Sequence, residues 1–237
     1  MRLCLKWAFA DIAYSTTGDA VLEKLDTNSS DYKSIEKQFT SKWKHNPNAP
    51  TVLCIIKIAP PQGIVDRFEA YRQKVMKDNP KIFGEGSDGN THRRFHGTGM
   101  TCTLNYNGAS PTLCKDAKCA VCSISRTSLQ LSYFKSNTSA GRFGPGLYTT
   151  STSSKSHGYN TKSEAALGQG IRGMFIVHVV VGNGHKMNND NWQLQGPPAG
   201  CHSVLGEVGG GGNLNFDECV VYTDDAICPA YFIVYRY

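Results

Sequence analysis

The 237-residue sequence lacks any hydrophobic run long enough to cross a membrane as a helix. Its longest apolar stretches, residues 52–58 and 175–181, have the length of strands, whereas a bilayer-spanning helix needs about 20 apolar residues. Lys6 and Asp11 interrupt the apolar residues at the start of the chain before a leader-like core develops. We therefore expect no membrane-spanning segment, no signal peptide and no membrane partner.

A strong excess of one charge is also missing. The formal net charge is +6, and the lysines are scattered through the N-terminal third instead of forming a stripe. This distribution permits a nucleic-acid partner but does not indicate one. The sequence has no internal repeat and no clear interdomain linker, and its 40% hydrophobic content suffices for one sizeable core.

The cysteine content does not fit a secreted disulfide framework. Nine cysteines are spread unevenly over a mid-sized chain. Secreted frameworks are short chains with even numbers of cysteines. We therefore expect reduced thiols in an intracellular protein, cytoplasmic or nuclear, with some of the thiols bound to a metal.

Helical patterns are concentrated in the first third of the chain. Residues 30–43 carry apolar side chains at three- and four-residue spacing, which predicts a helix capped by Ser30 or Asp31. Residues 66–77 have the same spacing, and residues 20–25 suggest a further short helix. The buried face of the first helix would hold Tyr32, Ile35, Phe39 and Trp43.

Strand patterns dominate the rest. Residues 51–60 form a β-branched apolar run that ends at prolines, and the strongest later strands are residues 175–182 and the segment from residue 218 to the end. These strands follow one another too closely for crossover helices. Helices first and strands later predict an α+β domain built on antiparallel sheets.

Four cysteines lie close together in the sequence, and the last two form a Cys-x2-Cys pair. Four thiolates complete a tetrahedral shell around zinc, and the Cys-x2-Cys spacing lets two sulfurs converge from one turn. The segment between them looks too polar to fold by packing alone, so we expect a structural zinc insert at residues 100–124. Free or disulfide-paired thiols are the alternative. The four candidate ligands are Cys102, Cys114, Cys119 and Cys122.

Three short motifs carry candidate catalytic groups: F-H-G-T at residues 95–98, G-P-G-L-Y…S-K-S-H-G-Y at residues 144–159, and D-E-C-V-V-Y at residues 217–222. Ser156 and Tyr159 stand three residues apart at an expected helix start, which would place a hydroxyl and a ring on one face. A carboxylate that opens an apolar strand needs solvent or a function.

In this order the motifs resemble the His-Tyr-Glu signature of the poly(ADP-ribose) polymerase catalytic domain, in the diphtheria-toxin-like branch of ADP-ribosyltransferases. SDYKSIEKQFTSKW…IIKI is similar to the opening helix and strand of that domain, and PPAGCHSVLG to its Pro-x-Gly-x-His-Ser-Val-x-Gly segment. The cysteine cluster is similar to that of zinc-bearing fungal relatives. The resemblance covers residues 30–237 and leaves residues 1–29 as an extension. It implies an α+β fold of two packed, mainly antiparallel sheets with flanking helices and a zinc-stapled loop.

The resemblance also implies an NAD+ site. His96 would bind the adenosine-side ribose, and the backbone of Gly97 would hold the nicotinamide carboxamide, which a side chain would obstruct. Tyr148 and Tyr159 would sandwich the nicotinamide ring, with a hydrogen bond to its amide from Ser156. The complete implied binding set is His96, Gly97, Thr98, Tyr148, Ser156 and Tyr159.

Within the implied catalytic set of Glu218, His96 and Tyr148, Glu218 would bind the 2′-hydroxyl of the nicotinamide ribose. It would also stabilise the oxocarbenium-like cation that forms as nicotinamide leaves. Asp217 and Glu207 are rival carboxylates that do not match the motif position, and Asp217 would point to the opposite face of the strand.

The implied activity is the transfer of ADP-ribose from NAD+ to a protein acceptor, the chain itself being a candidate. Residues 206–217 are short and Gly-rich where the polymerases carry a longer acceptor-binding loop, which favours transfer of a single unit. The alternatives are an NAD+ glycohydrolase and a catalytically weak module that binds NAD+ or nucleic acid. Residues 133–140 align with the loop lining the donor site, and we expect them to be mobile. The sequence does not indicate an oligomeric state.

Overall fold

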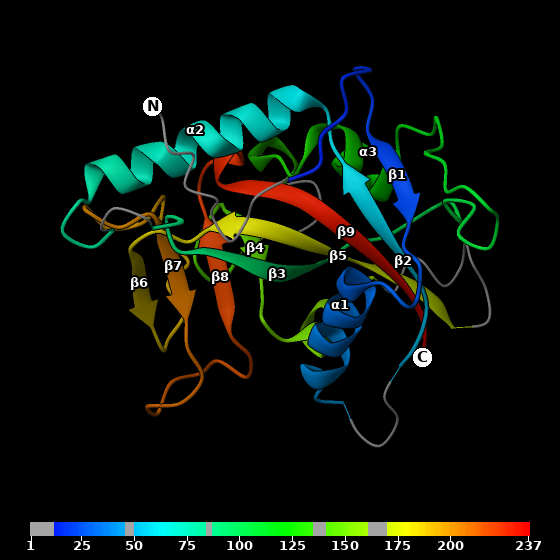
Figure 1. Ribbon diagram of the computed structural model, residues 1–237. Coiled ribbons are helices and arrows are strands. Elements are labelled where there is room, and N and C mark those ends of the chain that lie inside the picture. Colours follow the sequence, from blue (N-terminus) through cyan, green and yellow to red (C-terminus); the bar gives the residue numbers. More distant parts are fainter. Residues whose placement is uncertain (1–11, 46–49, 84–86, 135–140, 161–169) are drawn as a thin grey trace.

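The computed structural model describes residues 12–45, 50–83, 87–134, 141–160 and 170–237, which form two β-sheets with flanking helices (Figure 1). The five-stranded sheet has the order β1-β2-β9-β5-β3, and the four-stranded sheet has the order β4-β8-β7-β6. Strands β6 and β7 are parallel, whereas the other paired strands are antiparallel. The expected α+β class with two mainly antiparallel sheets is confirmed. The strands are β1 Val21–Lys24, β2 Thr51–Ala59, β3 Thr91–Gly97, β4 Leu147–Thr149, β5 Ile171–Val180, β6 Gly184–Met187, β7 Ser203–Gly206, β8 Glu218–Val221 and β9 Ile227–Arg236.

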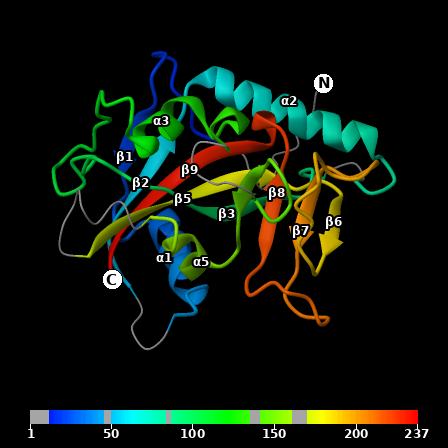
Figure 2. The same ribbon diagram turned by 180° about the vertical axis from the view of Figure 1, so that it is seen from behind.

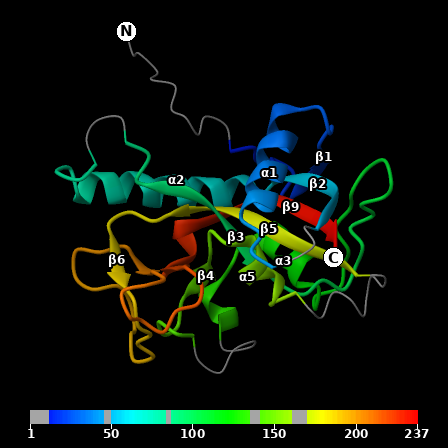
Figure 3. The ribbon, with the colours of Figure 1, turned by 90° about the horizontal axis from the view of Figure 1, so that it is seen from below.

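Helices cover both faces of the five-stranded sheet. Figures 2 and 3 show α1 on one side of the strands and α3 on the other. Side chains alternate between the faces along a strand, so Ile233 of β9 packs toward α1 whereas Phe232 packs toward α3. The helices are α1 Ser30–Ser41, α2 Gln62–Asp78, α3 Ala120–Thr127 and α5 Ser153–His157, with short 3₁₀ turns at Leu131–Tyr133 and Asp224–Ala226.

Two sequence expectations at the start of the domain differ from the structure. Residues 20–25 do not form a helix, because Val21–Lys24 pairs antiparallel with β2 as an edge strand and sets Glu23 opposite Lys57. This strand adds part of the N-terminal extension to the sheet. The cap of α1 is Ser29, whose hydroxyl accepts from the backbone N–H of Tyr32 at 3.2 Å; the expected caps, Ser30 and Asp31, lie one and two residues later in the chain.

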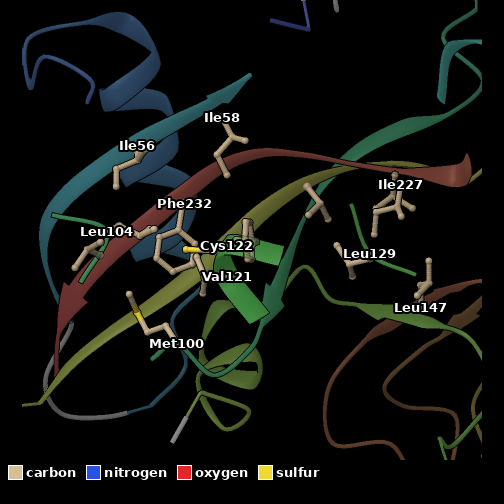
Figure 4. Close-up of a cluster of buried hydrophobic side chains, with 14 of the residues drawn as sticks. Ile56, Ile58, Met100, Leu104, Val121, Cys122, Leu129, Leu147, Ile227 and Phe232 are labelled. Carbon is tan, nitrogen blue, oxygen red and sulfur yellow. The ribbon is translucent and has the colours of Figure 1, made fainter. Parts of the chain in front are cut away.

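The α3 face holds the largest cluster of buried side chains, centred on β5 and β9. Phe175 and Phe232 meet there at 4.9 Å between ring centroids. Figure 4 shows Met100, Leu104 and Val121, all from the cysteine-bearing segment, arranged around Phe232. The cysteine-bearing segment therefore contributes some apolar side chains to the core in addition to its candidate metal ligands.

Among the described residues, one backbone bridge joins the sheets next to the chain segments that carry the motifs. The N–H of Phe95 donates to the carbonyl of Thr150 at 2.8 Å, and the N–H of Thr150 donates back at 3.1 Å. The end of β3 consequently lies beside the end of β4.

Candidate active site

The motif residues converge where the two sheets meet. His96 and Gly97 end β3, Tyr148 is the central residue of β4, and Glu218 is the first residue of β8. Strands β4 and β8 are adjacent and antiparallel, with Tyr148 opposite Val220. The structure thus brings together side chains that are far apart in the sequence.

His96 is held as a neutral acceptor. Its Nδ1 lies 3.0 Å from the carbonyl oxygen of Tyr148, and because a carbonyl only accepts, Nδ1 carries the proton. Burial lowers the pKa of His96, which outweighs the opposing effect of this hydrogen bond. The Nε2 lone pair is consequently available to accept a hydrogen bond from a hydroxyl group.

Gly97 lies so close to α5 that no side chain fits there. A Cβ on Gly97 would lie 1.9 Å from the carbonyl oxygen of Ser156. The N–H and C=O of Phe95 point toward β4, and residues two apart in a strand present these groups on the same edge. The backbone groups of Gly97 therefore point away from β5, on the outer edge of β3. Thr98 follows at the end of the strand and is half-buried.

The hydroxyl of Tyr148 is occupied by the fold itself. It donates to the carbonyl of Gly144 at 2.7 Å and accepts from the N–H of Phe143 at 2.9 Å. The ring is stacked on Phe134 at 6.1 Å and 18°. Burial raises the pKa of Tyr148, so the phenol stays protonated and only the ring is free to act on a ligand.

Ser156 and Tyr159 do not form the pair expected at a helix start. Ser156 lies near the end of α5 and is buried, whereas Tyr159 follows the helix and is 59% exposed. Burial and then the negative charge of Glu218 raise the pKa of Tyr159.

Glu218 is only 6% exposed and has one oxygen paired and one unpaired. Its Oε1 forms an ion pair with the ammonium group of Lys155, on α5. Its Oε2 is buried and has no hydrogen-bond partner among the described residues. A buried carboxylate oxygen without a donor is costly unless a ligand supplies one.

Lys155 is a site residue that the sequence motifs did not single out. Burial lowers its pKa, against the opposing effect of the Glu218 carboxylate. Its only signal in the sequence is a lysine between two serines, Ser154 and Ser156, which both prove to be buried. Because Glu218 lies on β8, far from Lys155 in the sequence, the motif that contains Lys155 does not indicate the ion pair.

The rival carboxylates lie elsewhere. Asp217 points away from Glu218, as expected for neighbouring strand positions, and accepts from the backbone N–H of Ser151 at 2.7 Å. Burial raises the pKa of Asp217. The hydrogen bond from Ser151, together with the other hydrogen bonds to this carboxylate, outweighs burial and lowers the pKa overall. Glu207 lies on a loop and pairs with Lys186 at 2.8 Å with 44% of its side chain exposed.

The four clustered cysteines converge on one point, and all are free thiols. Their sulfur atoms all lie within 4.8 Å of one another, with Cys102 3.5 Å from Cys122 and 3.7 Å from Cys119. Zinc–sulfur bonds of about 2.3 Å in a tetrahedron separate the sulfurs by about 3.8 Å, so the arrangement fits a zinc ion. The backbone N–H of Cys114 also donates to the sulfur of Cys122 at 3.2 Å, which orients that ligand.

Part of the expected donor loop falls outside the described residues. Tyr133 and Phe134 are described, but residues 135–140 are not, so the expectation of a mobile loop concerns a segment that the structure does not describe. Within the described part of the chain, no helix is both long and apolar enough to cross a membrane.

Comparison with known proteins identifies related sequences. The family model of the poly(ADP-ribose) polymerase catalytic domain matches residues 117–235, half of the chain. The human protein mono-ADP-ribosyltransferase PARP3 is 28% identical over 184 residues, and its mouse counterpart is 26% identical over 184 residues. The alignments cover 78% of this chain but only 27% of each relative.

Proposed function

The chain belongs to the family of the poly(ADP-ribose) polymerase catalytic domain, and on this basis we propose that it is an NAD+-dependent ADP-ribosyltransferase. It cleaves the bond between nicotinamide and ribose and transfers one ADP-ribose unit to a protein acceptor, which can be the chain itself. The catalytic domain comprises residues 30–237, with the zinc insert at residues 100–124, and β1 extends its sheet.

The observation that carries this proposal is the half-satisfied carboxylate of Glu218. The ion pair with the Lys155 ammonium group fixes Oε1, while buried Oε2 lacks a donor among the described residues. The 2′-hydroxyl of the nicotinamide ribose is a donor of the required kind. As nicotinamide leaves, positive charge develops on the ribose, and a carboxylate that is already fixed stabilises that charge without reorganising.

His96 and Gly97 bind the rest of the dinucleotide. The lone pair on Nε2 of neutral His96 accepts the hydroxyl of the adenosine-side ribose. The N–H and C=O of Gly97, which point away from β5, match the carbonyl and amino group of a carboxamide. The half-buried Thr98 continues this edge of the donor pocket.

Two tyrosine rings enclose the nicotinamide. Tyr148 is fixed by the two hydrogen bonds of its hydroxyl, and Tyr159 is exposed, so its ring can close on the opposite face of the ligand. Ser156, which lies between these two tyrosines in the sequence, is buried and supplies a hydrogen bond to the amide. Stacking fixes the ring and, with it, the glycosidic bond that breaks.

Transfer of a single unit is supported by the loop that precedes Glu218. Residues 207–217 are short and are attached to the end of β6, where Asn188 donates to the carbonyl of Gly209 at 2.9 Å and Asn213 donates to Asp190 at 2.7 Å. A loop attached in this way offers little surface for binding a growing polymer. The matching relatives are themselves named mono-ADP-ribosyltransferases.

We further propose that the four clustered cysteines hold a structural zinc ion, which supplies no chemistry to the reaction. All four ligand positions are filled by protein sulfur, so no coordination position is left for a substrate. Reduced thiols of this kind are typical of intracellular proteins, so we place the protein inside the cell, in the cytoplasm or the nucleus.

Mass spectrometry of the purified protein with NAD+ tests the activity. Wild type should release nicotinamide and gain the mass of one ADP-ribose on protein, whereas Glu218→Gln should bind NAD+ but lose most of its turnover. Glu207→Gln is the matched control, because Glu207 is a loop carboxylate outside the site. Release of free ADP-ribose alone would support the glycohydrolase, and NAD+ binding without release would support the binding module.

A further inference from the structure

We propose that Asp217 is a positioning residue that fixes the segment carrying Lys155 relative to Glu218. This inference rests on the proposed function only for its kinetic consequences. Its physical basis is that the Asp217 carboxylate, with 27% of its side chain exposed, contacts two other chain segments and immediately precedes Glu218. Each of these three segments contributes a group to the site.

The first connection runs to the segment between β4 and α5. Asp217 Oδ1 accepts from the hydroxyls of Thr150 at 2.9 Å and Thr152 at 2.8 Å, and Oδ2 accepts from the N–H of Ser151 at 2.7 Å. Both threonines are almost completely buried. This segment starts two residues after Tyr148 and leads within a few residues to Lys155, so Asp217 fixes the path of the chain between these two side chains.

The second connection runs to β3. The guanidinium group of Arg94 lies 3.5 Å from Asp217 Oδ2, two residues before His96 in the chain. The backbone bridge between Phe95 and Thr150 lies directly beside this ion pair. Asp217 thus supports the only described bridge between β3 and β4.

The third connection is to the catalytic carboxylate itself. Asp217 immediately precedes Glu218, and the two side chains point to opposite faces of the chain. The ammonium group of Lys155 also donates to the backbone carbonyl of Asp217 at 3.3 Å, in addition to its ion pair with Glu218. A shift of the 150–152 segment would therefore move Lys155 away from Glu218.

Two substitutions separate the hydrogen bonds of Asp217 from its charge. Asn keeps an oxygen that accepts from the N–H of Ser151 and has an amino group that can donate to the oxygens of the threonine hydroxyls. Ala removes every hydrogen bond of the side chain. Asp217→Ala should lower kcat for nicotinamide release by about 10²-fold, with KM for NAD+ within about threefold of wild type. Asp217→Asn should recover about tenfold or more of this loss.

The alkaline limb of the kcat profile gives a second readout. Burial lowers the pKa of Lys155; of the charged groups around its ammonium, the carboxylates of Glu218 and Asp217 raise this pKa and the guanidinium group of Arg142 lowers it. Removing the Asp217 charge should move the loss of activity at high pH to a lower pH in both variants. A residue that merely stabilises the fold would leave the limb in place.

Asp88→Ala is the matched control. Asp88 is also a carboxylate that accepts backbone N–H groups, those of Asn90 at 2.9 Å and Thr91 at 3.4 Å, but it lies at the opposite end of β3 from His96. It should lose stability without losing kcat. If Asp217→Ala and Asp88→Ala lose activity only in proportion to lost folded protein, or if Asp217→Ala keeps wild-type kcat, the inference is overturned.

A measurement without turnover distinguishes this inference from the proposed function. Acetylation of Lys155 by an N-hydroxysuccinimide ester, followed by peptide mass spectrometry, should be slow in wild type and severalfold faster in Asp217→Ala. Equal rates would overturn the inference even if wild type releases no nicotinamide. If Asp217→Ala does not fold, Thr152→Val removes a single donor from the same carboxylate and should give a smaller change in the same direction.

Discussion

At Gly97, one hydrogen atom in place of a methyl group allows β3 to approach α5. The carbonyl oxygen of Ser156 lies only 1.9 Å from the position that a Cβ would take, so the strand and the helix could not keep their present separation with any other residue. The resemblance to the polymerase family explained this glycine by the approach of nicotinamide. The structure adds a second reason, which acts before any ligand binds.

Gly97→Ala should therefore impair both the fold and NAD+ binding. We expect a loss of about 1–3 kcal/mol in the free energy of unfolding, because the clash falls on backbone atoms that cannot move aside freely. Gly63→Ala is the control, since Gly63 lies in α2 with no atom within 4 Å of the added Cβ, and it should gain about 0.5–1 kcal/mol. Urea unfolding measures both changes, and equal stability of the two variants would contradict the packing argument.

His178 makes the stability of the protein depend on pH. It lies in β5 opposite Arg93 and Cys228, and burial followed by the Arg93 charge lowers its pKa to about 4. The unfolded chain binds the same proton with a pKa of about 6.5. Stability is therefore full above pH 6.5 and decreases as the pH falls toward 4, by about 3 kcal/mol in total.

Replacing His178 by Gln removes this titrating group. Urea unfolding of wild type between pH 7 and 4.5 should show a steeper loss of stability than the same series on His178→Gln. Parallel series would contradict the prediction and indicate that the imidazole stays solvated.

At the scale of the element, α3 depends on the cysteine cluster at its first turn. Cys119 precedes the helix and accepts from the N–H of Ser123 at 2.9 Å through its carbonyl, and Cys122 lies within it. Val121 of the same turn packs into the main core around Phe232 (Figure 4). A metal that holds these sulfurs therefore also holds the helix against the sheet.

Elemental analysis should find one zinc ion per chain. Cys119→Ser should lose the metal and lower the thermal midpoint by about 5 °C or more. Cys201→Ser, a half-buried cysteine outside the cluster, should keep both metal and midpoint. A metal-free wild type, or a Cys119→Ser variant of unchanged midpoint, would contradict the zinc proposal.

Elements with a strong local period were predictable from the sequence, and short ones were not. The apolar spacing of α1 and the β-branched run of β2 indicated their type, and only the ends shifted, as with the cap at Ser29. Strand β1 was mistaken for a helix because its four residues become a strand only by pairing with β2. Such pairing is not local, so residue propensity does not report it.

The site shows the same division. The motifs named His96, Tyr148 and Glu218, whose convergence the structure describes, because each stands in a recognisable short pattern. Lys155 and Asp217 were not recognised as partners, since their contacts cross from α5 and the 150–152 segment to β8. Contacts between segments more than sixty residues apart leave no pattern within either segment.

At the scale of the whole molecule, the two sheets share one continuous core. Leu147 of β4 and Val221 of β8 belong to the same buried cluster as Ile56 of β2 and Phe232 of β9. Side chains of both sheets thus exclude water from one another, and neither sheet can separate from the other without exposing this cluster. We expect the two sheets to unfold as one cooperative unit.

Native-state hydrogen exchange of wild type and Val221→Ala tests this cooperativity. Val221 is fully buried, and its truncation should cost about 2 kcal/mol. If the sheets unfold together, the most protected amides of β9 should lose as much protection as those of β8, although β9 belongs to the other sheet. A loss confined to the four-stranded sheet would show that it opens separately. In that case Glu218 would separate from Lys155 whenever the four-stranded sheet opened, without unfolding of the rest of the protein.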